Sequence, residues 1–228
     1  MPDKGAVLVT GGSSGLGAAV ARVLGRVGRV AVVLDRVPPP FETDYVLVDL
    51  AHAQAAEKAV EKAARRHGGL SAVVTSAGTD SCGPLSKVSW EDWERVVRVN
   101  LLGTAAVVRS ALPHLERCGG RVITVASTLG LRAVADATAY CASKFGIVGF
   151  TRALAAETAG RVGVTLLVPG GMQTHFFEGR EERYRPPPDT QLNRPEDVAA
   201  AVLFVLEQPP GCEVRELVVT PARESSWP

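Results

Sequence analysis

Apolar and polar positions along the chain follow two alternating patterns. Near-continuous runs of Val, Leu and Ile, as in GAVLVTGG (5–12), predict strands buried on both faces. Apolar residues spaced three or four positions apart, as in LGAAVARVLGRVG (16–28), predict helices with one core-facing stripe. The whole pattern predicts strands at 5–12, 30–35, 45–50, 70–78, 120–127, 162–170 and 214–221. It predicts helices at 16–28, 51–68, 89–115, 137–160 and 194–208.

The order of these elements predicts the fold class. Strands separated by helices indicate βαβ crossovers and a parallel sheet. We therefore predict an α/β fold, a Rossmann-like doubly wound parallel sheet of about seven strands with helices on both faces. No repeat or long linker divides residues 1–228, so we expect a single domain. Ligands of such sheets bind beyond the carboxyl ends of the strands, where the strand order reverses.

Two segments break the pattern. RVPPPFET (36–43) stands where a crossover helix is often found, but three consecutive prolines exclude a helix there and predict a short extended loop. THFFEGREERYRPPPDTQLN (174–193) mixes charges, aromatics and prolines, and loops of this length are usually functional or mobile.

Composition narrows the class of protein. Hydrophobic residues make up 46% and charged residues 21% of the chain, as in soluble globular proteins. The formal net charge of +1 gives no reason to expect nucleic acid or an anionic membrane as partner. No uninterrupted apolar run reaches the roughly 18 residues of a membrane span, and the N-terminal sequence runs straight into a strand with no room for a signal peptide. We therefore expect a cytoplasmic protein.

The cysteines indicate no metal site. None forms a C-x-x-C pair, and no Cys/His cluster has zinc spacing. We interpret them as reduced thiols; they are Cys82, Cys118, Cys141 and Cys212.

A glycine-rich turn, TGGSSGLG (10–17), follows the first predicted strand and opens the first predicted helix. Backbone N–H groups at such a helix N-terminus favour a pyrophosphate. Gly11 would permit the tight turn, Gly15 a close approach to phosphate, and Gly17 close packing of the helix. The alternative is a flexible surface turn. The predicted cofactor-binding residues here are Gly11, Ser13, Ser14, Gly15, Leu16 and Gly17.

The second predicted strand ends in Asp35. A carboxylate there can accept both ribose hydroxyls of an adenosine, and it repels a 2′-phosphate, which favours NAD over NADP. Arg36 could bind a phosphate, so NADP stays possible, and a merely solvated aspartate is the other reading. Asp49 ends the third strand beside Leu50 and could hydrogen-bond an adenine amino group.

Tyr140 and Lys144 stand four positions apart in a predicted helix, so they share a face. An ammonium near a phenol favours the phenolate and lowers the tyrosine pKa, so that Tyr140 could exchange a proton with an alcohol or carbonyl. Alone, this spacing is common on solvated helices. Ser127, however, ends the preceding strand and can face Tyr140. Asn100 lies inside a predicted helix, where asparagine is unfavourable, which suggests a kink or a polar role.

With these residues in view, the chain resembles the short-chain dehydrogenase/reductase family over essentially its whole length. The matching motifs are T-G-x-x-x-G-x-G at 10–17, the Asp of VDL, the Asn of VNLLG, the Ser of VAS, Y-x-x-x-K at 140–144, and PG at 169–170 with Thr174 following. The resemblance implies one dinucleotide-binding and catalytic domain.

The resemblance also implies roles for individual residues. Tyr140 would be the general acid/base, Ser127 would hold the substrate oxygen, and Lys144 would bind the nicotinamide ribose. Asn100 would hold a water that links Lys144 to solvent. Thr174 would contact the nicotinamide carboxamide. Further cofactor residues would be Ser76, Ala77, Gly78, Pro169, Gly170 and Met172.

The chain departs from the family pattern after the fourth strand. TSAG (75–78) stands where the family has N-N-A-G, so Ser76 is shorter than the usual Asn. We expect a looser loop there, and the short connections after Asp35 and Thr174 suggest an open substrate cleft.

Substrate residues are expected in the segments after Ser127 and Pro169. Most candidates are apolar, which favours a substrate with an apolar portion, while loop packing is the alternative for each. The candidates are Leu129, Leu131, Val134, Gly171, Met172, His175, Phe176 and Phe177. Tyr184 with Arg180, Arg183 and Arg185 could attract an anion, but a solvated charged loop is the favoured interpretation.

Three functions remain open. The leading hypothesis is an oxidoreductase that moves a hydride between NAD(H) and a small-molecule secondary alcohol or ketone. The alternatives are an NADPH-dependent carbonyl or 3-oxoacyl reductase and a non-catalytic nucleotide-binding sensor or scaffold. The helices at 89–115 and 137–160 carry more apolar residues than one stripe needs, so we expect a homodimer or homotetramer.

Overall fold

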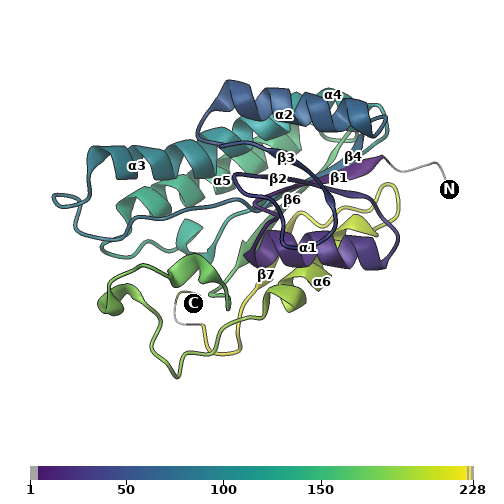
Figure 1. Ribbon diagram of the computed structural model, residues 1–228. Coiled ribbons are helices and arrows are strands. Elements are labelled where there is room, and N and C mark those ends of the chain that lie inside the picture. The colour runs from purple at the N-terminus through teal and green to yellow at the C-terminus, as the bar shows by residue number, and fades with distance from the viewer. Residues whose placement is uncertain (1–4, 225, 227–228) are drawn as a thin grey trace.

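A computed structural model describes residues 5–224 and 226 (Figure 1). Within them, seven parallel strands form one sheet in the order β3-β2-β1-β4-β5-β6-β7, a Rossmann-like α/β fold. The strands are β1 (Ala6–Thr10), β2 (Ala31–Asp35), β3 (Asp44–Leu47), β4 (Leu70–Thr75), β5 (Arg121–Val125), β6 (Gly163–Pro169) and β7 (Glu216–Val219). The strand order reverses between β1 and β4, so the predicted fold class is confirmed.

Helices cover both faces of the sheet (Figure 1). One face is covered by α1 (Gly15–Arg26) and α6 (Pro195–Leu206), and the other by α2 (Ala53–Arg66), α4 (Thr104–Glu116) and α5 (Thr138–Glu157). Successive strand residues point to opposite faces, so Leu8 joins the α2/α4 core while Val9 joins the α1/α6 core. Both side chains are fully buried, which explains why the strands lack polar alternation.

The predicted helix at 89–115 is confirmed as one helical segment, but it is not α-helical throughout. It divides into α3 (Trp90–Val97), a π-helical segment (Arg98–Gly103) and α4. Ser89 caps the start of α3 by accepting the Asp92 N–H at 3.1 Å. Trp90–Glu116 is long and apolar enough to cross a membrane by length and composition alone, but half of its most apolar 18-residue window is buried in the fold. We therefore interpret it as a core helix.

The proline-rich connection at 36–43 joins two neighbouring parallel strands without a helix, as predicted. Parallel strands usually need a crossover of a dozen or more residues. Here Phe41 takes part of a helix's packing role, because it lies against the α1/α6 core and under the Arg22 guanidinium of α1, 4.1 Å from the ring centroid. The carboxyl end of β2 therefore faces the site with little chain in front of it.

Candidate active site

A cavity of about 1070 Å³ lies at the carboxyl ends of the central strands. Every residue predicted to bind a cofactor lines it, with the exception of Ser13. Ser13 is buried beneath the glycine turn, where its N–H donates to the Asp35 carboxylate at 2.9 Å and its hydroxyl donates to the Val37 carbonyl at 2.7 Å. Ser13 therefore shapes the wall of the cavity without facing it.

The glycine turn leaves no room for side chains. Gly11 has a φ of +66°, and a Cβ there would lie 2.7 Å from Ala77 Cα. Gly15 has a φ of +51°, and a Cβ at Gly17 would lie 2.3 Å from the Gly11 carbonyl oxygen. The turn therefore requires glycine and presents a bare backbone at the start of α1. This cradle fits the pyrophosphate of a dinucleotide.

Asp35 sits at the end of β2, on the cavity wall. One carboxylate oxygen accepts the Ser13 N–H, and the other accepts the Arg36 N–H at 2.6 Å. Oδ1 also accepts the Val37 N–H at 3.4 Å, so the carboxylate is fixed in place, while Oδ2 keeps acceptor capacity for a ribose hydroxyl. Arg36 is exposed at the rim.

Asp49 is held by two donors on the same wall. It accepts the Ala51 N–H at 2.9 Å and the Arg95 guanidinium at 3.0 Å. Burial raises the pKa of the Asp49 carboxyl, but these two donors outweigh burial and hold the pKa below its usual value. Asp49 is therefore ionised and can accept a hydrogen bond from an amino group.

Ser76 joins the two central strands. Its hydroxyl donates to the Thr10 carbonyl at 2.5 Å, and the Ala77 N–H donates to the Thr10 hydroxyl at 3.1 Å. The expectation of a looser loop is wrong here, because the shorter side chain still bridges β4 to β1. Ser76 also packs under the turn, 2.8 Å from a Cβ position at Gly17.

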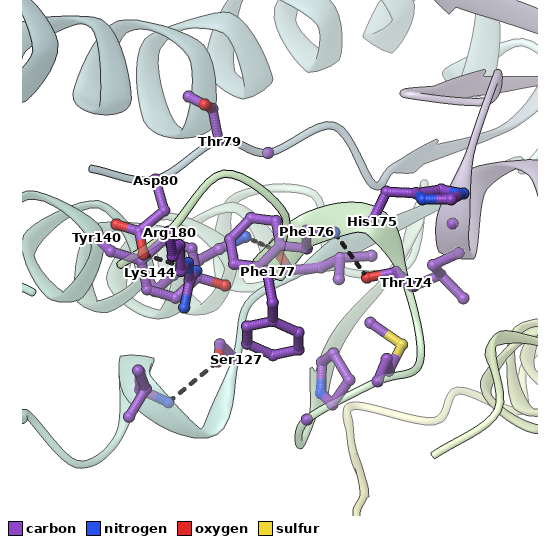
Figure 2. Close-up of a pocket in the computed structure, with 18 of the residues that line it drawn as sticks. Thr79, Asp80, Ser127, Tyr140, Lys144, Thr174, His175, Phe176, Phe177 and Arg180 are labelled. Carbon is purple, nitrogen blue, oxygen red and sulfur yellow. Dashed lines mark hydrogen bonds and ion pairs between the residues drawn. The ribbon is translucent and has the colours of Figure 1, made fainter. Parts of the chain in front are cut away.

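Ser127, Tyr140 and Lys144 meet on the floor of the cavity (Figure 2). The Ser127 side chain lies near the Tyr140 hydroxyl, where it acts to lower the pKa of Tyr140. The Lys144 ammonium lies 5.6 Å from the centre of the Tyr140 ring and donates to the Val125 carbonyl at 2.9 Å. Two elements therefore bring the groups together, the end of β5 and the first turns of α5. This arrangement can transfer a proton to or from an oxygen bound between Ser127 and Tyr140.

The pKa values of this group differ from the sequence expectation. Burial raises the pKa of Tyr140 and outweighs the opposing hydrogen bond from Ser127, so the expected lowering is wrong for the protein by itself. Burial also lowers the pKa of Lys144 to about 8. Both groups are therefore shifted toward their neutral forms, and Tyr140 holds its proton at neutral pH.

Asn100 does not line the cavity but fixes the loop beside it. Its Oδ1 accepts the Thr79 N–H at 2.8 Å, and its Nδ2 donates to the Thr79 carbonyl at 2.9 Å and to the Ser143 hydroxyl at 3.1 Å. The side chain is buried, and it lies in the π-helical segment. The sequence suggested a kink or a polar role for Asn100, and both occur, since the helix is irregular at Asn100 and the side chain has polar partners. The side chain therefore clamps the loop, and its expected role in holding a water stays a prediction.

The segment after β6 packs over Tyr140, and we call residues 174–185 the strap. It contains two 3₁₀ turns, His175–Phe177 and Glu182–Tyr184. The Phe176 ring lies 5.5 Å from the Tyr140 ring, centroid to centroid, and the Thr174 hydroxyl accepts the Phe176 N–H at 3.3 Å. The expected open cleft is therefore wrong on this side, where an aromatic wall covers Tyr140.

The other substrate candidates divide between cavity, rim and core. Leu129, Val134, Gly171 and Phe177 line the cavity. His175 lies at the rim, where it is exposed, points away from Tyr140 and pairs with Glu178 at 2.5 Å (Figure 2). Leu131 packs instead against the small apolar cluster beneath α5.

Several residues of the cavity were missed by the sequence reasoning. Asp80 and Arg180 form a buried ion pair at 2.8 Å, so the interpretation of Arg180 as part of a solvated loop is wrong. The Tyr184 hydroxyl donates to Asp136 at 2.9 Å, and Glu224 accepts the Gly171 N–H at 3.0 Å. Each contact joins residues far apart in the chain, and no local pattern signals such a pairing.

Comparisons with known proteins agree with this geometry. The family model for short chain dehydrogenases matches residues 5–185. An uncharacterized oxidoreductase of Staphylococcus aureus is 32% identical over 97% of this chain and 98% of its own length. Carbonyl reductase family member 4 of Danio rerio is 32% identical over 89% of this chain and 91% of its own length. Among solved structures, an alcohol dehydrogenase from the archaeon Thermococcus sibiricus, complexed with 5-hydroxy-NADP, has a TM-score of 0.85 at 26% identity, covering 95% of this chain and 96% of that one.

Proposed function

The chain belongs to the short-chain dehydrogenase/reductase family, and on that premise we propose that it moves a hydride between NAD(H) and a secondary alcohol or ketone, with Tyr140 as the general acid/base. At the family level it is an NAD(P)-dependent oxidoreductase that acts on an alcohol or carbonyl group. One observation carries the finer proposal: Ser127, Tyr140 and Lys144 converge on the floor of a cavity whose other end is the glycine cradle.

The roles of the three side chains follow from their chemistry. The bound nicotinamide supplies or accepts the hydride. Tyr140 keeps its proton at neutral pH, so it donates that proton to a carbonyl oxygen during reduction. Ser127 holds the same oxygen through its hydroxyl. Lys144 would hydrogen-bond the ribose of a bound nicotinamide and, when protonated, would stabilise the Tyr140 phenolate after the proton has left.

The direction of the reaction should depend on pH. Oxidation of an alcohol needs the Tyr140 phenolate, and burial raises the pKa of Tyr140 and disfavours that form. We therefore propose that carbonyl reduction is favoured at neutral pH and that the rate of alcohol oxidation rises toward alkaline pH.

The preference for NAD rests on Asp35. Its carboxylate is held at the end of β2 by the Ser13 and Arg36 N–H groups, on the wall where a ribose would lie. A 2′-phosphate there would meet a fixed negative charge. The NADP alternative stays as a second outcome, since Arg36 is exposed beside Asp35 and the Thermococcus sibiricus relative was solved with an NADP derivative.

Fluorescence titration with NADH and with NADPH tests the cofactor, and the Tyr140→Phe variant tests the chemistry. We expect tighter binding of NADH than of NADPH. We expect Tyr140→Phe to lose turnover by roughly 10³-fold while its NADH affinity stays unchanged, because only the transferable proton is removed.

Other outcomes would select the alternatives. Tighter binding of NADPH would overturn the Asp35 argument and favour a reductase that uses NADPH. Full activity in Tyr140→Phe would exclude the proposed mechanism. Cofactor binding by wild-type protein with no turnover of any alcohol or ketone tested would favour a sensor.

A further inference from the structure

The strap is fastened across the cavity by a buried ion pair. Arg180 lies near the middle of the strap, and its guanidinium donates to the Asp80 carboxylate at 2.8 Å. The side chain of Arg180 is 15% exposed and that of Asp80 only 6%. Charged side chains are almost never fully buried unless they are paired, and these two side chains are largely removed from solvent. The two residues are a hundred positions apart, so the pair ties the loop after β6 to the loop after β4.

Both ends of the pair are held by further contacts. Asp80 also accepts the Ser81 N–H at 2.7 Å and the Cys82 thiol at 3.1 Å. Its neighbour Thr79 is clamped by Asn100. On the strap side, the Arg180 guanidinium stacks on two phenylalanine rings, 4.8 Å from the centroid of each. The rings are those of Phe176 and Phe177, so Arg180 fixes the aromatic wall.

The aromatic wall reaches the reacting group. The Phe176 ring contacts both Tyr140, with ring centroids 5.5 Å apart, and the Arg180 guanidinium, 4.8 Å from the Phe176 centroid. A chain of contacts therefore runs from the rigid end of β4, through Asp80 and Arg180, to the ring beside the catalytic hydroxyl. The two charges also act on Tyr140 directly and in opposite senses, since Asp80 raises the pKa of Tyr140 and Arg180 lowers it.

We propose that Asp80 and Arg180 are positioning residues that hold Phe176 against Tyr140 and thereby restrict the substrate to ketones and secondary alcohols with a small or flat substituent on that side. The restriction rests on the proposed function. A flat apolar group can stack beside Phe176, whereas a branched group needs the space that the ring occupies. Breaking the pair leaves a buried charge without its partner, and the strap must then open to let water reach that charge.

The strap itself offers a matched control. Arg183 lies three positions after Arg180, pairs with Glu181 of the same strap at 2.9 Å, and stacks on Tyr184. It is exposed and makes no ion pair across the cavity among the described residues. Asp80→Asn and Arg180→Gln should therefore release the strap, whereas Arg183→Gln should not. Arg180→Lys keeps the charge and should retain part of the fastening.

Cleavage by chymotrypsin measures the strap without any need for activity, because Phe176, Phe177 and Tyr184 are cleavage sites that all four variants retain. We expect Asp80→Asn and Arg180→Gln to be cut in the strap about tenfold faster than wild type, with Arg180→Lys between them and Arg183→Gln at the wild-type rate. Equal cleavage of all variants would overturn the fastening. Circular dichroism and NADH binding separate an open strap from an unfolded chain, and Arg180→Lys serves if the harsher variants fail to fold.

Steady-state kinetics test the specificity. In wild type, ketones with a methyl or planar aryl substituent should be reduced with a higher kcat/KM than ketones with a tert-butyl substituent. In Asp80→Asn and Arg180→Gln this ratio should fall about tenfold, mainly through KM for the bulky ketones. A faster-cut strap with an unchanged ratio would overturn the specificity. If wild type reduces no ketone, the proposed function fails, while the cleavage rates still decide whether the pair fastens the strap.

Discussion

The two halves of the cavity are built in different ways. The cofactor half is made of strand ends and a glycine turn, where backbone atoms approach so closely that a Cβ at Gly11 or Gly17 would collide with main chain. The substrate half is made of three loops joined by side chains, through Asp80 with Arg180 and Asp136 with Tyr184. The first half therefore depends on regular elements packed on the sheet, and the second on a few long-range polar contacts.

The difference teaches where each half is vulnerable. An atom added by substitution in the cofactor half cannot be accommodated by small shifts, because its neighbours are backbone atoms within the core of the sheet. In the substrate half, a lost side chain frees a loop while the sheet remains intact. Changes in the first half should therefore act on folding and cofactor binding together, and changes in the second on substrate selection.

The largest effect is expected where the two halves meet, at Ser127. Its hydroxyl follows the end of β5 and lies near Tyr140, whose pKa it acts to lower. Ser127→Ala removes a donor to the substrate oxygen, and kcat should fall by about 10²–10³-fold. NADH affinity, measured by fluorescence titration, should stay within about twofold of wild type, because the lost hydroxyl is directed at the substrate oxygen. A comparable loss of NADH affinity would mean that Ser127 belongs to the cofactor half instead.

The next largest effect should come from Gly17→Ala in the cofactor half. The new Cβ would lie 2.3 Å from the Gly11 carbonyl oxygen, so the turn must shift. We expect a loss of about 2–3 kcal/mol in the free energy of unfolding, measured with urea, and weaker NADH binding. Gly25→Ala is the matched control, since it lies in the same helix with nothing within 4 Å of its Cβ position. It should stabilise the helix slightly; equal losses in both variants would contradict the crowding argument.

A smaller effect should appear in the pH dependence of stability. Burial lowers the pKa of Lys144 to about 8, against 10.5 in the unfolded chain. Between these values the unfolded state binds more protons, so Lys144 makes the protein more stable as the pH rises from 8 to 10. Above about 10 the raised pKa of Tyr140 opposes this gain, because the unfolded state then loses the tyrosine proton first.

The Lys144→Met variant isolates this contribution, because every other titrating group is present in both proteins. Without cofactor, the free energy of unfolding of wild type minus that of the variant should increase by about 1–2 kcal/mol as the pH rises from 7.5 to 9.5. A pH-independent difference between the two proteins would show that Lys144 has an ordinary pKa.

The smallest effect should come from Asp136 in the substrate half. This residue has a φ of +59°, the single positive value among the described non-glycine residues. Asp136→Ala and Asp136→Gly both lose the hydrogen bond from Tyr184. The alanine variant is also destabilised by the left-handed backbone conformation, which glycine adopts without strain. We expect the alanine variant to be about 1 kcal/mol less stable in urea than the glycine variant, with NADH affinity equal in both. Equal stabilities would mean that the loop relaxes to another conformation.

The same contrast explains how much could be predicted from the sequence. The twelve predicted elements occur with ends that differ by a few residues, because Val-rich runs and helical spacing reflect local burial. The cofactor wall was also predicted, because Gly11, Gly17 and Asp35 occupy fixed places relative to strand ends. Tyr140 and Lys144 were found together because four positions on a helix make one face.

The remaining features depend on contacts between distant parts of the chain. Asp80 and Arg180 have no pattern in their own surroundings, and Arg180 resembles the exposed Arg183 in sequence. Burial of Tyr140 comes from the strap above it, so the direction of its pKa shift could not be obtained from Lys144 alone. The irregularity at Asn100 was suspected, but its form depended on Thr79 and Ser143.

The π-helical segment Arg98–Gly103 sets the rotation of the side chains of α3 about the helix axis relative to those of α4. Each residue of a helix advances the direction of the side chain by about 100°. Deletion of one residue here would restore a regular α-helix, but α3 would then turn by about that angle relative to α4. Trp93, which donates to the Thr138 hydroxyl at 3.1 Å, would leave α5, and Asn100 would leave Thr79. The extra residue of the π-helical segment therefore lets α3 contact α5 while Asn100 contacts Thr79. We expect a single-residue deletion in this helix to break one of these two contacts.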